Sequence, residues 1–295
     1  MRILLAGDRG QLGRELHRLW DGRHEVCGAD LPELDIADEA AVRGWFEKVR
    51  PDVVVNAAAF TRVDDCETER AAAARANATG SGVLAAAAAA RGAALVQVST
   101  DYVFDGNRPA PQPYREDDLP SPVSWYGQTK LDGERAVLAA APHAWILRTA
   151  WLYSAHGRNF PKTMLRLAAS RPDRPLRVVN DQFGCPTWAR RLAEQIARVI
   201  AAAPAPGVYH AVAAGTATWY AFARHFLAEM GIPFRIEPCA ATEYPTPARR
   251  PHNSILENTR LNAAGINVFP DWHEDVSAFV RAHRAELLAE TLTKS

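Results

Sequence analysis

The sequence has little cysteine and no excess of charge of either sign. Its four cysteines form no CxxC pair, which argues against a disulfide framework or a zinc site. Thirty-four basic residues balance 34 acidic residues, so the chain lacks the cationic field with which nucleic-acid-binding proteins displace counterions. We therefore expect no nucleic-acid partner, although a local basic site for one small anionic ligand is still allowed.

Long apolar runs are also missing. Charged residues interrupt each apolar stretch well before the ~20 residues that a membrane-spanning helix requires. The apolar segment 3–7 is too short for a signal peptide, and no small-residue cleavage site follows it. The nine histidines form no HExxH cluster, so their spacing predicts no metal site. We expect a cytoplasmic protein with reduced thiols and no membrane contact.

Strand-like and helix-like segments alternate through the first half of the sequence. Runs of apolar and β-branched residues predict buried strands at 2–6, 24–29, 52–56 and 94–99. Helices are expected at 11–20, 39–49 and 67–91. Strands that are apolar throughout favour a parallel sheet covered on both faces. The predicted fold class is therefore α/β, with a Rossmann-like doubly wound sheet.

The pattern loosens after Thr100, where the proline-rich segment 105–123 is expected to be a loop. Further helices are predicted at 124–140, 189–203, 219–230 and 275–289, and further strands at 145–152, 177–180 and 207–210. We predict a dinucleotide-binding domain at 1–150, with returning segments at about 175–213. Residues 151–174 and 214–295 are expected to form a smaller, mixed substrate domain.

A glycine turn follows the first predicted strand directly and opens the first helix. It contains Gly7, Gly10 and Gly13 in a GxxGxxG pattern. Such glycines let the backbone approach a pyrophosphate, and the helix N-terminus supplies free N–H donors. The surrounding βαβ context favours dinucleotide binding.

Two charged residues bear on which dinucleotide binds. Asp30 follows the second strand, where a carboxylate can accept hydrogen bonds from the adenosine ribose and would repel a 2′-phosphate. Arg9 lies within the glycine turn and could instead pair with that phosphate. The two residues favour opposite cofactors, so both NADH and NADPH remain open.

A tyrosine and a lysine stand one helical turn apart, at Tyr126 and Lys130. An ammonium group close to a phenol is expected to lower the phenol's pKa and make it a usable proton donor to a carbonyl oxygen. Thr100 ends the preceding strand and could orient that carbonyl. These three residues are the predicted catalytic set.

These motifs resemble the short-chain dehydrogenase/reductase superfamily in its extended branch. Five stretches resemble, within it, the dTDP-4-dehydrorhamnose reductase family, and the resemblance runs nearly end to end. They are VSTDYVFDG at 98–106, YGQTK at 126–130, RTAWLY at 148–153, NDQFGCPT at 180–187 and YPTPARRP at 244–251.

The resemblance implies the NAD(P)H-dependent reduction of dTDP-4-dehydro-L-rhamnose to dTDP-L-rhamnose. It places Gly10, Gln11 and Leu12 at the pyrophosphate. The other implied cofactor contacts are Asp35 and Ile36 at the adenine, Ala59, Phe60 and Thr61 near the nicotinamide, and Tyr126 and Lys130 at its ribose. The implied sugar contacts are Thr100, Asp101 and Trp151, whose indole suits a methylated sugar. Arg249 and Arg250 are candidate contacts for the substrate diphosphate.

The chain departs from the family pattern at two positions, Ser124 and Arg190. Ser124 stands where asparagine is usual, two residues before the tyrosine. Some members bridge a dimer with magnesium held by glutamates; Glu15 matches one of these, but Arg190 occupies the place of another. We therefore assign no metal ligand and expect a monomer or a weak homodimer.

Two alternatives stay open at this point. A nucleotide-sugar epimerase or dehydratase of the same branch would retain and regenerate NAD. A non-catalytic regulatory subunit would keep the fold but have no turnover, although the intact Thr100, Tyr126 and Lys130 argue against it.

Overall fold

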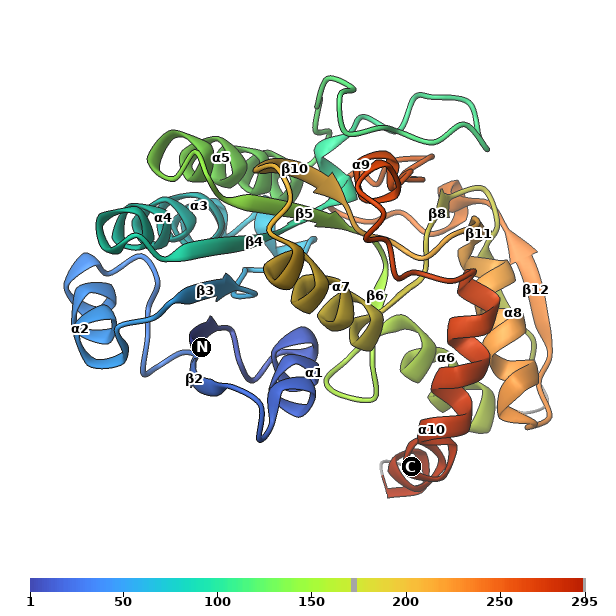
Figure 1. The fold of residues 1–295 in the computed structure, drawn as a ribbon. Helices are drawn as coiled ribbons and strands as arrows, with labels where there is room; N and C mark the ends of the chain where they lie inside the picture. Colours follow the sequence, from blue (N-terminus) through green and yellow to red (C-terminus); the bar gives the residue numbers. More distant parts are fainter. Residues whose placement is uncertain (171–173, 294–295) are drawn as a thin grey trace.

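Short runs of aliphatic and β-branched residues form a six-stranded sheet in the computed structural model, which describes residues 1–170 and 174–293 (Figure 1). The strand order is β10-β5-β4-β3-β1-β2, and every pairing is parallel. The strands are β1 (Arg2–Ala6), β2 (Glu25–Ala29), β3 (Val53–Asn56), β4 (Ala94–Thr100), β5 (Trp145–Thr149) and β10 (Gly207–His210). The predicted doubly wound α/β fold is confirmed.

Helices cover both faces of this sheet because successive strand residues point to opposite sides. Ile3 and Leu5 pack with α1 (Gln11–Trp20) and α7 (Ala189–Ala202). Leu4 packs on the other face, with α2 (Glu39–Val49), α4 (Gly80–Arg91) and α5 (Trp125–Ala140). The apolar strands are therefore buried on both sides, as their composition predicts.

The long helix expected at 67–91 is present but interrupted. A 3₁₀ turn at Asp65–Glu67 and the short helix α3 (Arg70–Ala74) lead into a π-helical turn at Arg75–Thr79, and α4 follows. Turns of this wide type often occur at functional positions. This one contains the buried residue Asn77, which contacts the site described below.

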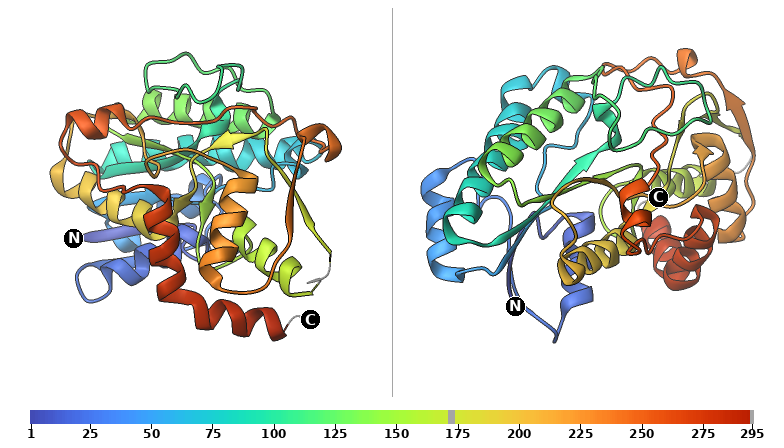
Figure 2. Two further views of the ribbon diagram at one scale, coloured as in Figure 1. Left: turned by 90° about the vertical axis from the view of Figure 1, so that its right-hand side faces the viewer. Right: turned by 45° about the horizontal axis from the view of Figure 1, so that its top comes forward.

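The C-terminal part has a core of its own, and Figure 2 shows its helices together at one end of the molecule. Aromatic residues fill this core, among them Tyr153, Phe222, Phe226 and Phe279. The helices are α6 (Phe160–Ser170), α8 (Trp219–Met230) and α10 (Trp272–Thr293), with the short α9 (Thr259–Ala263) beside β10. Three strand pairs accompany them: β6 (Leu152–Tyr153) with β9 (Thr187–Trp188), β7 (Leu176–Val179) with β12 (Ile236–Cys239), and β8 (Phe183–Gly184) with β11 (Ala217–Thr218).

Two predicted segments differ in the structure. Strand β7 pairs with β12 and not with the large sheet, whereas α7, which follows it, packs on that sheet. The division into two domains stays a prediction. The strand predicted at 145–152 ends at Thr149, because Trp151 has a positive φ of 46° and turns the chain. Residues 171–173 of the predicted segment 151–174, and residues 294–295, lie outside the described residues.

Within the described ranges, no helix combines the length and the apolar character that crossing a membrane requires.

Candidate functional site

A cleft of about 750 Å³ opens at the carboxyl ends of the large sheet's strands. The strand order reverses between β1 and β3, and ligands of open α/β sheets bind at such a point. All the cofactor-binding residues predicted from the sequence line this cleft, and so do Thr100, Asp101 and Trp151. Arg249 and Arg250 are not among its lining residues.

The glycine turn forms one wall of the cleft and accepts no larger residue at two positions. Gly7 has a φ of +79°, and a Cβ there would lie 2.6 Å from the backbone nitrogen of Ala58. A Cβ on Gly13 would lie 2.4 Å from the carbonyl oxygen of Gly7. Gly10 caps α1 without a side-chain hydrogen bond, so the first N–H groups of the helix lack a side-chain acceptor. This arrangement fits the diphosphate of a dinucleotide.

The loop after β2 places three carboxylates, Asp30, Glu33 and Asp35, near the glycine turn, and two of them pair with a guanidinium. Asp30 accepts hydrogen bonds from the backbone nitrogens of Leu31, at 2.8 Å, and Arg9, at 3.3 Å. The Arg9 guanidinium pairs with Glu33 at 2.6 Å and also donates to the carbonyl of Leu31. Asp35 pairs with Arg75 at 2.7 Å, which lowers the pKa of that carboxyl.

Asn77 holds the loop that follows β3. Its amide oxygen accepts the Phe60 N–H at 2.8 Å, and its amide nitrogen donates to the Phe60 carbonyl at 3.1 Å and to Thr129 of α5 at 3.0 Å. The buried Asn77 therefore ties the loop that follows β3 to the helix that carries Tyr126 and Lys130. The sequence analysis did not identify this residue, because its partners are distant in the chain.

Helix α5 begins in a way that explains the departure at position 124. The hydroxyl of Ser124 accepts the N–H of Gly127 at 3.2 Å and caps the helix. Serine and asparagine are both preferred at this position. The substitution therefore keeps the helix start, and with it the placement of Tyr126.

Burial determines the protonation of Tyr126 and Lys130. It raises the pKa of Tyr126 well above its usual range, and the nearby Asp101 carboxylate raises it further. The ammonium of Lys130 donates to the carbonyl of Val98 at 2.7 Å, and burial lowers its pKa to about 8. The expected lowering of the Tyr126 pKa is therefore wrong for this structure, since burial raises the pKa of this phenol.

Thr100 and Asp101 form a buried pair next to the phenol. The Thr100 hydroxyl donates to Asp101 Oδ1 at 2.9 Å and accepts the N–H of Tyr102 at 3.2 Å. It also acts on the pKa of Tyr126, which it lowers against the effect of burial. Asp101 Oδ2 has no hydrogen-bond partner in the described part of the chain. Burial raises the pKa of Asp101 to about 6. The predicted catalytic residue Thr100 thus lies against the predicted proton donor.

Trp151 forms an aromatic wall together with a residue that the sequence analysis missed. Its ring stacks on that of Trp219 with centroids 3.4 Å apart and an interplanar angle of 7°. A Cβ on Gly184 would lie 2.4 Å from the Trp151 indole, so only glycine fits there. Trp219 also lines the cleft. Such a stacked pair offers a flat apolar surface, which suits the apolar face of a sugar.

The two arginines predicted at the substrate diphosphate have different surroundings. Arg250 forms a bidentate pair with Asp64, at 3.0 and 2.9 Å, whereas Arg249 is exposed. Their role stays a prediction.

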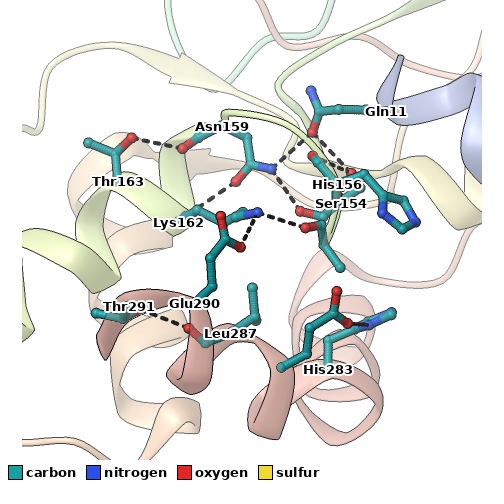
Figure 3. Close-up of polar contacts among 12 residues, drawn as sticks. Gln11, Ser154, His156, Asn159, Lys162, Thr163, His283, Leu287, Glu290 and Thr291 are labelled. Atoms are coloured by element: carbon teal, nitrogen blue, oxygen red, sulfur yellow. Dashed lines mark hydrogen bonds and ion pairs between the residues drawn. The ribbon is translucent and has the colours of Figure 1, made fainter. Parts of the chain in front are cut away.

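A hydrogen-bond network joins the glycine turn to the C-terminal part (Figure 3). The amide oxygen of Gln11 accepts from Ser154 at 3.2 Å and from Asn159 at 2.9 Å. Lys162, one turn further on, pairs with Glu290 of α10 at 2.6 Å. The network holds the loop that places the exposed Arg158 at the cleft, another residue that the sequence analysis missed.

The residues considered for magnesium are differently engaged. Arg190 pairs with Glu194 at 2.8 Å. Glu15 is buried, with His156 Nε2 3.9 Å from its carboxylate. The structure therefore gives no support to a magnesium site at these positions.

The chain resembles known proteins over nearly its whole length. Residues 1–285 match the family model described as the RmlD substrate binding domain. The dTDP-4-dehydrorhamnose reductase of Escherichia coli K12 is 42% identical over 290 residues, which cover 94% of this chain and 96% of that protein. A crystal structure of a dTDP-4-dehydrorhamnose reductase from Clostridium acetobutylicum superimposes with a TM-score of 0.92 at 41% identity, covering 96% of this chain and 99% of that one. The dTDP-4-dehydrorhamnose reductase of Bacillus anthracis, solved in complex with NADP, superimposes with a TM-score of 0.91 at 34% identity. The match covers 95% of this chain and 99% of that one.

Proposed function

The chain belongs to the dTDP-4-dehydrorhamnose reductase (RmlD) family, and on this premise we propose that it reduces the C4 ketone of dTDP-4-dehydro-L-rhamnose to an alcohol. The product is dTDP-L-rhamnose, and the reaction is the final step of its biosynthesis. One observation supports this function above all: a protonated phenol, a threonine hydroxyl and an aromatic wall share one cleft with a glycine-lined helix N-terminus that has no side-chain cap.

The cleft's residues divide into a cofactor part and a sugar part. The glycine turn would hold the diphosphate of NADH or NADPH, and Lys130 would hold the nicotinamide ribose. When bound, the reduced nicotinamide supplies a hydride. Trp151 and Trp219 would bind the deoxysugar through its apolar face, next to Thr100 and Asp101.

Tyr126 is the proton donor in this mechanism. Its raised pKa keeps the phenol protonated at neutral pH, so the proton is available when negative charge develops on the C4 oxygen. Thr100, which lines the same cleft, would orient that oxygen with its hydroxyl. Lys130 is positively charged below its pKa of about 8 and stabilises the phenolate that is left behind.

The test is an assay with dTDP-4-dehydro-L-rhamnose and each reduced cofactor, followed by the loss of nicotinamide absorbance. We expect stoichiometric consumption of NAD(P)H and formation of dTDP-L-rhamnose. Tyr126→Phe should lower turnover by ~10²-fold or more, since it removes the proton donor. Binding of NADH, measured by its fluorescence, should persist in this variant.

Tyr102→Phe is the matched control. The two rings meet edge to face with centroids 5.6 Å apart, and both line the cleft. Losing a hydroxyl that only binds should cost about tenfold or less. Near-normal turnover in Tyr126→Phe would refute the mechanism. Sugar conversion without net NAD(P)H consumption would indicate the epimerase or dehydratase alternative. The cytoplasmic location and the monomer or weak homodimer stay predictions.

A further inference from the structure

The carboxylate at the end of β2 is fixed in position. Both oxygens of Asp30 accept backbone N–H groups, one from Leu31 and one from Arg9. Asp30 also lines the cleft, on the side of the predicted adenosine position. A carboxylate at this point of a Rossmann fold accepts hydrogen bonds from the ribose hydroxyls. It therefore suits the 2′-hydroxyl of NADH.

The only guanidinium within the glycine turn is already engaged. Arg9 Nη2 pairs with Glu33 Oε1 at 2.6 Å, and Nη1 donates to the carbonyl of Leu31 at 3.2 Å. Arg9 lines the cleft, whereas Glu33, on the loop after β2, is not among the lining residues. The guanidinium is thus held on that loop by a residue that does not itself face the cofactor.

These contacts determine which charges would surround the 2′-phosphate of a bound NADPH. Such a phosphate carries about two negative charges at neutral pH. It would meet the carboxylate of Asp30, and the guanidinium of Arg9 in the same part of the cleft is already paired with a second carboxylate, Glu33. NADPH must therefore draw Arg9 away from Glu33 before it gains a counter-ion, whereas NADH needs no such rearrangement.

We propose that Glu33 is a specificity-determining residue. It holds Arg9, so that this guanidinium is not free to pair with the 2′-phosphate of NADPH. Together with Asp30, it gives the enzyme a preference for NADH. This inference rests on the proposed function and deepens it, because it assigns the cofactor preference to a residue outside the cleft. Glu33 acts only through Arg9, so its effect depends on the presence of that arginine.

The experiment measures kcat/KM for NADPH and for NADH in wild type, Glu33→Gln, Arg9→Gln and the double variant. The wild type should prefer NADH. Glu33→Gln should raise the NADPH-to-NADH ratio about fivefold, because the freed guanidinium can pair with the phosphate. The double variant should lose this gain. The gain should also shrink in high salt, since both partners are exposed.

Glu243→Gln is the matched control. Glu243 pairs with Arg177, and the exposures of that pair, 41% and 49%, resemble the 47% and 55% of Glu33 and Arg9. Glu243 does not line the cleft, so its removal should leave the ratio unchanged. A wild-type preference for NADPH, an unchanged ratio in Glu33→Gln, or the same gain in the double variant or in Glu243→Gln would overturn the inference.

Dissociation constants separate this inference from the proposed function. Fluorescence titration of NADH and NADPH without any sugar should show the same shift in ratio for Glu33→Gln. If dTDP-4-dehydro-L-rhamnose is not reduced, the proposed function fails, and the binding ratios still decide the role of Glu33.

Discussion

Replacing Asp101 by asparagine should stabilise the folded protein at neutral and alkaline pH. Asp101 is 2% exposed, and its Oδ2 has no hydrogen-bond partner among the residues described. Burial raises the pKa of this carboxyl from 3.8 to about 6. Each tenfold change in the ionisation equilibrium corresponds to about 1.4 kcal/mol, so the buried charge costs about 3 kcal/mol of folding free energy well above pH 6.

The gain should depend on pH in a defined direction. Between pH 3.8 and about 6 the folded wild type holds a proton on Asp101 that the unfolded chain has released. The contribution of Asp101 to wild-type stability therefore falls as the pH rises through this window and is constant above it. Asparagine carries no charge, so the advantage of Asp101→Asn should be about 3 kcal/mol at pH 8 and about 1 kcal/mol at pH 4.5.

Urea denaturation of wild type and variant at pH 8 and pH 4.5 measures both values. Asp117→Asn is the control, because Asp117 is 84% exposed in its pair with Arg260 and its charge needs no desolvation. The control should change stability little at either pH. If Asp101→Asn gains nothing at pH 8, or gains equally at both pH values, the desolvation argument is wrong. Activity should fall in this variant. A buried charge that destabilises the fold is kept where the function needs it, and Asp101 lies in the cleft.

Two further predictions concern Lys130 and Trp219. The kcat/KM for NADH should fall as the pH rises through about 8, because the buried Lys130 ammonium loses its proton there, and Lys130→Met should abolish this break in the pH profile. Tyr126 should contribute no break near that pH, since its pKa lies far higher. Trp219→Ala should raise the KM for the sugar about three- to tenfold by removing the stacking partner of Trp151, with kcat nearly unchanged, whereas Trp219→Phe should restore most of the binding. A loss confined to kcat would contradict a binding role.

Most of the sheet could be predicted from the sequence because its strands carry a local signal. An unbroken run such as Val53–Val55 is apolar on both faces, which only a doubly covered parallel strand requires. The short strands of the C-terminal part lack this signal. Strand β7 resembles a strand of the large sheet in composition, and its pairing with β12, sixty positions later, depends on tertiary structure alone.

The residues of the site also differ in whether the local sequence identifies them. The glycine turn and the Tyr126–Lys130 spacing are local patterns, so they could be identified from sequence. Asn77 and Trp219 act through partners that lie far away in the chain, Thr129 and Trp151, and no periodicity marks them. The engagement of Arg9 by Glu33 belongs to the same class, because a loop conformation brings them together.

The reversal of the expected Tyr126 pKa has a consequence for how the pair works. Spacing alone predicts attraction between an ammonium and a phenolate, but in the resting protein there is no phenolate, and burial keeps the phenol neutral. The attraction appears only when the phenol has given up its proton to the substrate oxygen. A charge one helical turn away then stabilises a state close to the transition state more than it stabilises the resting state, and only such a difference accelerates the reaction. The lysine's contribution should therefore appear in kcat, and it should be lost when either Lys130 or Tyr126 is replaced.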